Sequence, residues 1–393
     1  MSYLKLTDVE LAGKHVLIRA DMNVPLQEGI ISDDTRIRAS LTSIQYCLAQ
    51  GAAQIIILTH LGRPIVESPQ KKDSVLPIAR RLSELLNCSV TFVKNWQATQ
   101  KIRSERIVML ENVRLNEGEK QNDPHLANHY AALCDVFVND AFASAHRSEA
   151  STNAIAKFAP IACAGCLLDQ EIQALNLALS SPKKPFLAIV GGAKISTKLS
   201  ILNSLANKVD QLIVGGGMAN TFLMAAGYHV GASLVEISRI KDAKNIMDKI
   251  KARGGNIPLP SDVKVAKYLS QEVAATLKNI ASLSHDDMIF DIGPKSIEQL
   301  NKTICQAKTI VWNGPMGVFE LDQFSDGTLL LAQSIAKSTA FSIVGGGETI
   351  AAVTKFGLAN QMSYLSTGGG AFLAFLEGKT LPAIAALMKR FDG

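Results

Sequence analysis

Long apolar runs, dense cysteine and blocks of one charge are all scarce in this 393-residue sequence. The longest nearly uninterrupted apolar stretch, Ala159 to Leu168, contains Pro160 and Gly165 and falls well short of the roughly 18 residues that a membrane span needs. The six cysteines are irregularly placed, unlike the disulfide framework of a small secreted domain. The amino end has no apolar signal segment, so the sequence predicts a protein of the cytosol.

The charge balance is also unremarkable, with 40 basic and 35 acidic residues and a net charge of +5. There is no Lys/Arg block of the kind that nucleic-acid-binding tails carry, so we expect neither a nucleic-acid nor a membrane partner. A hydrophobic content of 47% excludes the disordered and collagen-like classes. At roughly 150 residues per domain, the length predicts two large domains or three ordinary ones.

Short β-branched runs recur along the chain, and longer segments with helical spacing separate them. The runs are His15 to Ala20, Gln54 to Thr59, Ile107 to Leu110, Asp135 to Val138, Phe186 to Val190, Gln211 to Val214, Asp287 to Phe290, Thr309 to Trp312 and Phe341 to Val344. Strands that alternate with helices favour parallel sheets. The fold class predicted is therefore α/β, with two doubly wound, Rossmann-like domains of parallel sheet.

The residues that follow these strands differ between the two halves of the chain. Ligands of open parallel sheets lie beyond the carboxyl ends of the strands, so these residues are the candidate binding groups. In the first half they are basic, acidic or amide residues; in the second half they are glycines, as in Gly215 to Gly217 and Gly345 to Gly347. We therefore expect two domains with different ligands and a boundary near Leu168 to Pro185, where a helix and a punctuated linker follow one another.

Glycine-rich turns between a strand and a helix let phosphate oxygens approach main-chain N–H groups. Several such turns in one half favour a nucleotide or phosphoester site, although glycines that only permit close packing are the alternative. The GxxxxGK[ST], GxGxxG, HRD and DFG patterns are absent, which disfavours an ordinary P-loop, dinucleotide or protein-kinase site. Lys194 and Lys198 are predicted to share one face at the start of a helix, where an anion would offset their unfavourable position in the helix dipole. The alternative is that both are solvated lysines in a frayed first turn.

In the first half, Arg36, His60, Arg63, Arg114 and Arg147 lie in separate predicted loops. Each one alone is an ordinary surface side chain. If the loops share one sheet edge, together they form a pocket for a small anion with phosphate or carboxylate groups, which arginine binds in bidentate fashion. Asp21 and Asn23 would orient hydroxyl groups of the same ligand.

Nine motifs, in order along the chain, resemble those of the phosphoglycerate kinase family. They are RADMNVP (19–25), THLGRP (59–64), LENVR (110–114), AHR (145–147), GGAKISTK (191–198), GGGMANTFL (215–223), WNGPMGVFE (312–320), GGGET (345–349) and STGGGA (366–371). The resemblance runs nearly from end to end.

The resemblance implies a bilobal enzyme in which residues 1–168 bind 3-phosphoglycerate, residues 169–185 form a hinge helix and linker, and residues 186–377 bind the nucleotide. The tail, about residues 378–393, would pack back on the first domain. The implied substrate-binding residues are Asp21, Asn23, Arg36, His60, Arg63, Arg114 and Arg147.

For the nucleotide, the resemblance implies that Lys198 contacts the phosphates, Glu320 the ribose and Gly293 the rim of the adenine pocket. The phosphate and metal region would be formed by Gly346, Gly347, Glu348 and Thr349, with Mg²⁺ held at Glu348. Arg36 and Lys194 would be catalytic. The chain departs from the usual family pattern in having Glu348 for Asp, Ser144 for Thr and Met22 for Phe or Leu, and the first of these changes touches the metal.

The implied reaction is reversible phosphoryl transfer between ATP and the carboxylate of 3-phosphoglycerate, giving 1,3-bisphosphoglycerate and ADP. A carboxylate nucleophile is already ionised, so the reaction needs positive charge from Arg36, Lys194 and Mg²⁺ rather than a general base. Hinge closure would exclude water, and the family expectation is a monomer. The alternatives are a binding protein for a phosphometabolite or nucleotide without catalysis and a dinucleotide-dependent oxidoreductase, which the missing GxGxxG pattern disfavours.

Overall fold

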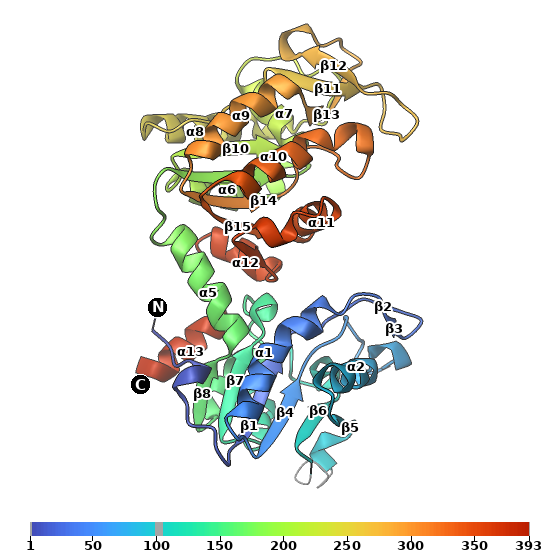
Figure 1. Ribbon diagram of the computed structural model, residues 1–393, viewed down its shortest axis with the longest axis vertical. Coiled ribbons are helices and arrows are strands. Elements are labelled where there is room, and N and C mark those ends of the chain that lie inside the picture. The colour runs from blue at the N-terminus through green and yellow to red at the C-terminus, as the bar shows by residue number, and fades with distance from the viewer. Residues whose placement is uncertain (1, 99–104, 393) are drawn as a thin grey trace. The chain divides into compact units, whose positions relative to one another are not determined.

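Two separate parallel sheets organise the chain (Figure 1). The computed structural model describes residues 2–98 and 105–392. The chain divides into a first unit, Met1–Gln173 with Thr380–Gly393, and a second unit, Ala174–Lys379. Helix α5 (Cys166–Leu179) carries the chain out of the first unit and into the second.

The first unit is built on a six-stranded sheet with the order β5-β6-β4-β1-β7-β8, in which every pairing is parallel. Its strands are β1 (His15–Ala20), β4 (Gln54–Leu58), β5 (Thr91–Val93), β6 (Ile107–Leu110), β7 (Val136–Asp140) and β8 (Ile161–Ala164). All of β1 after His15 is buried, as expected for a central parallel strand covered on both faces. The small hairpin of β2 (Leu26–Gln27) and β3 (Ile30–Ile31) follows β1.

The helices of the first unit are α1 (Thr35–Ala49), α2 (Leu76–Leu86), α3 (Pro124–Ala131), α4 (Ile155–Phe158) and the last helix, α13 (Pro382–Asp392). Helix α1 packs with α2, and α3 packs with α4. Helix α13 returns to this unit and packs on α4 and β8. Two hydrogen bonds fix its start, from Asn153 Nδ2 to the Pro382 carbonyl (2.8 Å) and from Ala383 N to the Ala145 carbonyl (3.2 Å).

The second unit has a five-stranded parallel sheet with the order β10-β9-β14-β15-β16. Its strands are β9 (Phe186–Gly191), β10 (Gln211–Gly215), β14 (Thr309–Asn313), β15 (Phe341–Gly345) and β16 (Tyr364–Ser366). The chain moves from β9 to β10 on one side and later adds β14 to β16 on the other. The strand order therefore reverses between β9 and β14, and their carboxyl ends mark the crevice where ligands of such sheets bind.

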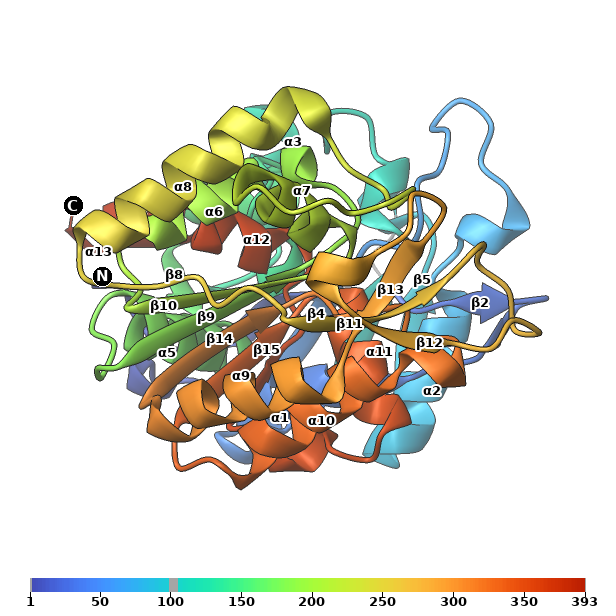
Figure 2. The same ribbon diagram turned by 90° about the horizontal axis from the view of Figure 1, so that it is seen from above.

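Helices cover both faces of this second sheet (Figure 2). One group contains α6 (Leu199–Ala206), α7 (Gly217–Ala225), α8 (Ile240–Ala252) and α12 (Gly370–Leu376). The other contains α9 (Pro294–Gln306), α10 (Asp326–Lys337) and α11 (Gly347–Lys355). Within the described residues, no helix is long and apolar enough to cross a bilayer.

The second unit also has a three-stranded antiparallel sheet, β12-β11-β13, which the sequence analysis did not predict. It consists of β11 (Asp262–Ala266), β12 (Thr276–Asn279) and β13 (Met288–Ile292). The run Asp287 to Phe290 does form a strand, but the expectation that it lies in the parallel sheet is wrong. A β-branched run predicts a strand without predicting the direction of its partner, and here β11 supplies an antiparallel one.

Candidate active site

In the first unit, basic side chains gather beyond the carboxyl ends of β1, β4, β6 and β7. Arg36, in the first turn of α1, donates from Nη1 to Asp21 Oδ1 at 3.0 Å. Burial raises the pKa of Asp21, but the neighbouring charges, among them those of Arg36 and Arg19, outweigh burial and hold it below its usual value. Asp21 is therefore a buried carboxylate that fixes Arg36 while leaving its side chain 37% exposed.

Arg114 and Arg147 share one buried carboxylate, that of Glu149. Its Oε1 lies 3.4 Å from Arg114 Nη2 and 3.9 Å from Arg147 Nη1. Glu149 Oε2 lies 4.0 Å from Arg19 Nη2, and it has no hydrogen-bond partner among the described residues. Three guanidinium groups around one carboxylate leave a local excess of positive charge, which suits an incoming anion.

His60 lies within the same cluster and is 3% exposed. Burial lowers its pKa to about 3, and the charges of Arg19, Arg114 and Arg147 act in the same direction. His60 is therefore neutral at physiological pH. Because Arg19 Nη2 lies 3.3 Å from His60 Nδ1 and guanidinium only donates, Nδ1 is the acceptor and Nε2 carries the proton.

Asn23 and Arg63 complete the set expected in this unit. Asn23 Oδ1 accepts from Gly62 N at 2.9 Å, and Arg114 Nη1 donates to the Gly62 carbonyl at 2.6 Å, so Gly62 links the loops after β1, β4 and β6. Arg63 follows Gly62 and is exposed. The loops that carry the seven predicted substrate residues thus meet at one edge of one sheet.

In the second unit, Lys198 lies at the carboxyl ends of β9 and β14, where the strand order reverses. Its Nζ donates to Asn313 Oδ1 at 2.7 Å and to the Gly191 carbonyl. Burial lowers the pKa of Lys198 to about 8, and nearby Glu348 opposes that shift. The main chain at residue 191 passes so close to that of Pro315 that glycine is required, since a Cβ on Gly191 would lie 1.9 Å from the Pro315 carbonyl oxygen.

Lys194 is placed differently from Lys198, and the prediction that both lie on one face at the start of a helix is wrong. A 3₁₀ turn (Ile195–Thr197) follows Lys194, and α6 begins only at Leu199, with Lys198 as its N-cap. The apolar spacing had predicted the helix correctly but not its start. Lys194 is exposed in an extended conformation, so its ammonium group is free of the contacts that hold Lys198.

Residues 345–349 connect the end of β15 to the first turn of α11. Gly346 has φ +97°, and a Cβ there would lie 2.4 Å from Asn313 Nδ2. Thr349 Oγ1 accepts from Gly314 N at 2.7 Å, which ties this turn to the end of β14. Gly347 and Glu348 are exposed in the first helical turn. These residues lie at the same sheet edge as Lys198.

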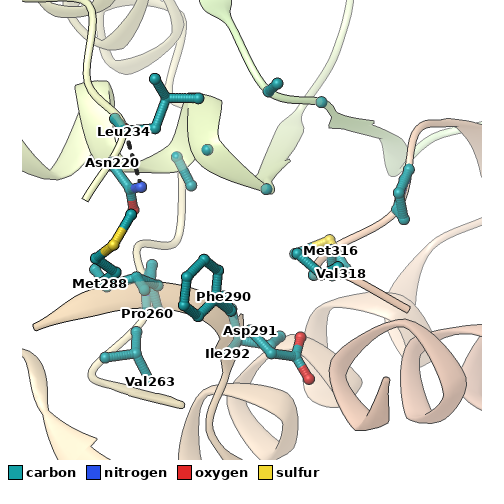
Figure 3. Close-up of a pocket in the computed structure, with 18 of the residues that line it drawn as sticks. Asn220, Leu234, Pro260, Val263, Met288, Phe290, Asp291, Ile292, Met316 and Val318 are labelled. Atoms are coloured by element: carbon teal, nitrogen blue, oxygen red, sulfur yellow. Dashed lines mark hydrogen bonds between the residues drawn. The ribbon is translucent and has the colours of Figure 1, made fainter. Parts of the chain in front are cut away.

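A cavity of about 460 Å³ lies beside these turns. Met288, Pro260 and Phe290 line one side, with Met316 and Val318 across from them (Figure 3). Glu320 and Glu348 also line it, whereas Gly293 does not. Gly293 is instead buried at the start of α9, where a Cβ would lie 2.3 Å from Asp262 Cγ. An apolar slot beside glycine turns suits a planar base attached to phosphates.

Two buried polar residues line this cavity and were missed by the sequence analysis. Asn220 donates from Nδ2 to the Leu234 carbonyl at 3.1 Å, and its Oδ1 has no hydrogen-bond partner in the part of the chain that the structure describes. Asp291 Oδ2 accepts from Gly327 N at 2.8 Å, and burial raises its pKa to about 7. Asn220 belongs to the motif GGGMANTFL, so its position just after a glycine turn could have indicated that it lines the cavity.

Comparison with known proteins shows the family to which the chain belongs. The model of the family described as phosphoglycerate kinase matches residues 6–379. The chain belongs to the phosphoglycerate kinase family. A phosphoglycerate kinase transfers a phosphoryl group between ATP and 3-phosphoglycerate, so the chain is a kinase of glycolysis, and neither alternative class is favoured.

Solved phosphoglycerate kinases agree with this assignment over the whole chain. The enzyme from Coxiella burnetii is 50% identical, with a TM-score of 0.95 and coverage of 99% of this chain and 100% of that one. The enzyme from Pyrococcus horikoshii OT3 is 32% identical, with a TM-score of 0.83 and coverage of 99% of both chains. The α/β fold of two parallel-sheet domains is therefore shown by both the coordinates and the family.

Proposed function

We propose that the two units divide the substrates of the kinase, with 3-phosphoglycerate on the first and the nucleotide on the second. The observation that carries this division is the contrast between the two sheet edges. One gathers Arg36, Arg114 and Arg147 around buried carboxylates, and the other presents glycine turns and Lys198 beside an apolar cavity. On this proposal the domains are residues 1–168 with the tail, and 186–377, joined by the hinge segment 169–185.

On the first unit, we assign the anionic groups of 3-phosphoglycerate to five basic or imidazole side chains, namely Arg36, His60, Arg63, Arg114 and Arg147. Guanidinium groups match phosphate and carboxylate oxygens in bidentate geometry. Neutral His60 would donate from Nε2, and Asp21 and Asn23 would accept from the substrate hydroxyl. The shared carboxylate of Glu149 keeps Arg114 and Arg147 together before the substrate arrives.

On the second unit, we assign the phosphates to Lys198 and to the turn Gly346, Gly347 and Thr349, and the ribose to Glu320. The apolar slot would take the adenine. Gly293 would act indirectly, since it is packed on Asp262 behind the wall formed by Ile292. Main-chain N–H groups at the start of α11 would donate to the phosphate oxygens, as at other helix-terminal anion sites.

We further propose that Mg²⁺ enters with the nucleotide and meets Glu348. Among residues 2–98 and 105–392, no group of three or more His, Cys, Asp or Glu side chains could hold a metal ion. A single exposed carboxylate fits Mg²⁺, which commonly takes one or two carboxylates together with phosphate oxygens and water. When bound, the ion would neutralise charge on the phosphates; Glu348 supplies an oxygen ligand at the start of α11.

The catalytic residues of the proposal are Arg36 and Lys194, one from each unit. The carboxylate of 3-phosphoglycerate attacks the γ-phosphorus, and the bond from that phosphorus to the bridging oxygen breaks, leaving the electron pair on ADP. A loose transition state spreads negative charge over the phosphoryl oxygens, and two cations stabilise it. Since the substrates are assigned to different units, a hinge movement at α5 would bring them together and exclude water from the acyl phosphate.

We also propose that the enzyme is a monomer and that it is located in the cytoplasm. The six cysteines are all free, and Cys88 and Cys305 are exposed, which fits a reducing compartment. Light scattering of the purified protein and fractionation of the source cells test the two statements separately.

Single substitutions test the catalytic assignment. We expect Lys194→Ala to lower kcat about 100-fold or more, with little change in the KM for ATP, because the charge acts mainly in the transition state. Arg36→Ala should lower kcat and also raise the KM for 3-phosphoglycerate. Lys302→Met, which removes an exposed lysine that pairs with Glu298 on the same helix, is the matched control. A near-normal kcat for Lys194→Ala contradicts the assignment.

A further inference from the structure

The turn that follows Lys194 is held by an acidic residue from a distant segment. Glu236 Oε1 accepts from Ser196 Oγ at 2.6 Å, and Glu236 Oε2 accepts from Ser196 N at 2.9 Å. Ser196 is the middle residue of the 3₁₀ turn between Lys194 and Lys198. Both oxygens of one carboxylate therefore bind the same residue, which fixes the direction of the turn as well as its position.

Glu236 is itself anchored to a buried helix. Its main-chain N–H donates to Thr221 Oγ1 at 3.2 Å, and two residues earlier the Leu234 carbonyl accepts from Asn220 Nδ2. Asn220 and Thr221 are each 1% exposed in α7. An exposed pair of hydrogen bonds between two loose loops contributes little, but here one partner is tied to the core of the unit. The anchored segment can therefore impose its position on the Ser196 turn.

Lys194 is connected to this arrangement through both main chain and charge. Thr197 Oγ1 donates to the Lys194 carbonyl at 2.8 Å, so the residue after Ser196 bonds back to Lys194. The hydrogen bonds from Ser196 lower the pKa of Glu236, and the charge of Lys194 lowers it further. Glu236 is thus a carboxylate within electrostatic reach of Lys194.

We propose that Glu236 is a positioning residue for phosphoryl transfer, which holds the Ser196 turn so that Lys194 is presented at a fixed place beside the nucleotide phosphates. The inference rests on the catalytic role proposed for Lys194. Leu234, in the same anchored segment, lines the cavity assigned to the base. The segment from Leu234 to Glu236 therefore links the wall of the base cavity to the turn that carries the lysine.

Steady-state kinetics of Glu236→Ala and Glu236→Gln test the proposal. We expect Glu236→Ala to lower kcat about tenfold, which corresponds to about 1.4 kcal/mol, with the KM for ATP changed less than about threefold. Glutamine can still bond both Ser196 N and Ser196 Oγ, so Glu236→Gln should retain most of kcat. Glu298→Gln, which removes an exposed charge on α9, should leave kcat unchanged. Equal losses in Glu236→Ala and Glu236→Gln would overturn positioning by hydrogen bonds.

A double-mutant cycle with Lys194→Ala separates this inference from the proposal beneath it. If Glu236 acts through Lys194, adding Glu236→Ala to Lys194→Ala changes kcat by less than about twofold, since contacting groups are not additive. If Lys194→Ala loses activity and adding Glu236→Ala lowers kcat a further tenfold, the catalytic role of Lys194 is supported and the positioning role of Glu236 is contradicted. If Lys194→Ala keeps its kcat, both roles are contradicted. Ser196→Ala, which removes one of the two bonds from the other side, should give a smaller loss in the same direction.

Discussion

The buried position of Lys198 predicts that nucleotide affinity depends on pH in a range where ADP itself does not titrate. Burial lowers the pKa of Lys198 to about 8 in the free protein, against 10.5 for an exposed lysine. On the proposal that Lys198 contacts the nucleotide phosphates, the bound phosphates favour its charged form, so the lysine keeps its proton in the complex. Raising the pH through 8 therefore removes the charged form from the free protein and weakens binding.

The size of this change in the apparent Kd follows from the two protonation states of Lys198. If only the protonated protein binds tightly, the apparent Kd increases by a factor of about ten between pH 7 and pH 9, equivalent to about 1.4 kcal/mol. The effect of pH on folding stability has the opposite sign to its effect on nucleotide binding. Between pH 8 and 10.5 the unfolded chain holds a proton that the folded chain has lost, so the contribution of Lys198 to the free energy of unfolding increases with pH.

Calorimetric titration of ADP with Mg²⁺ held constant, without 3-phosphoglycerate, measures this dependence. Lys198→Met should bind ADP weakly with the same Kd at pH 7 and pH 9, and Lys198→Arg should lose the dependence because arginine stays charged. The control is Lys302→Met, whose profile should match wild type. A wild-type Kd that is constant from pH 7 to pH 9, or a Lys198→Met profile with the wild-type slope, would refute the reasoning.

Three further predictions concern single residues of the second unit. Glu348→Asp should keep most activity, whereas Glu348→Ala and Glu348→Gln should lose it and need more Mg²⁺; superimposable Mg²⁺ titrations for Glu348→Ala and wild type would remove Glu348 from the metal site. On the proposal that adenine fills the apolar cavity, Asn220→Leu should reduce the preference for ATP over ITP by about tenfold, because Asn220 Oδ1 would accept from a 6-amino group but not from a 6-oxo group, a difference of about 1–3 kcal/mol. The ratio of kcat/KM for the two nucleotides measures this preference, and an unchanged ratio contradicts the prediction. Burial raises the pKa of Asp291 from 3.8 to about 7, so its contribution lowers the free energy of unfolding as the pH rises from 4 to 7. Urea unfolding should show that Asp291→Asn flattens this pH dependence. An equal pH dependence in both proteins would show that Asp291 does not titrate between pH 4 and pH 7.

The main sheets could be predicted from the sequence because buried parallel strands are continuous β-branched runs. His15 to Ala20 and Ile107 to Leu110 were predicted with their observed bounds. The short strand β5 (Thr91–Val93) and the antiparallel β12 (Thr276–Asn279) were not predicted. Strand β5 is only three residues long and β12 has a single apolar residue, and the stability of both depends on pairing with partners that no local pattern identifies.

The candidate site was predictable where its residues carry charge in a motif. Arg114 and Arg147 were named from the sequence, but Glu149, which lies between them, was not. A glutamate two residues after an arginine is ordinary in sequence, and only the fold shows that this carboxylate is buried among three guanidinium groups. Glu236 was missed for the same reason, because its partner Ser196 lies 40 residues earlier in the chain.

The return of α13 to the first unit affects how the protein can be made. The first unit is discontinuous, since Thr380–Gly393 belongs with Met1–Gln173, and the second unit is inserted between these two pieces. During synthesis the second unit emerges complete while the first still lacks the helix that packs on α4 and β8. The ribosome therefore releases α13 only after the whole second unit, and until then Asn153 Nδ2 and the Ala145 carbonyl lack the main-chain partners that Pro382 and Ala383 supply.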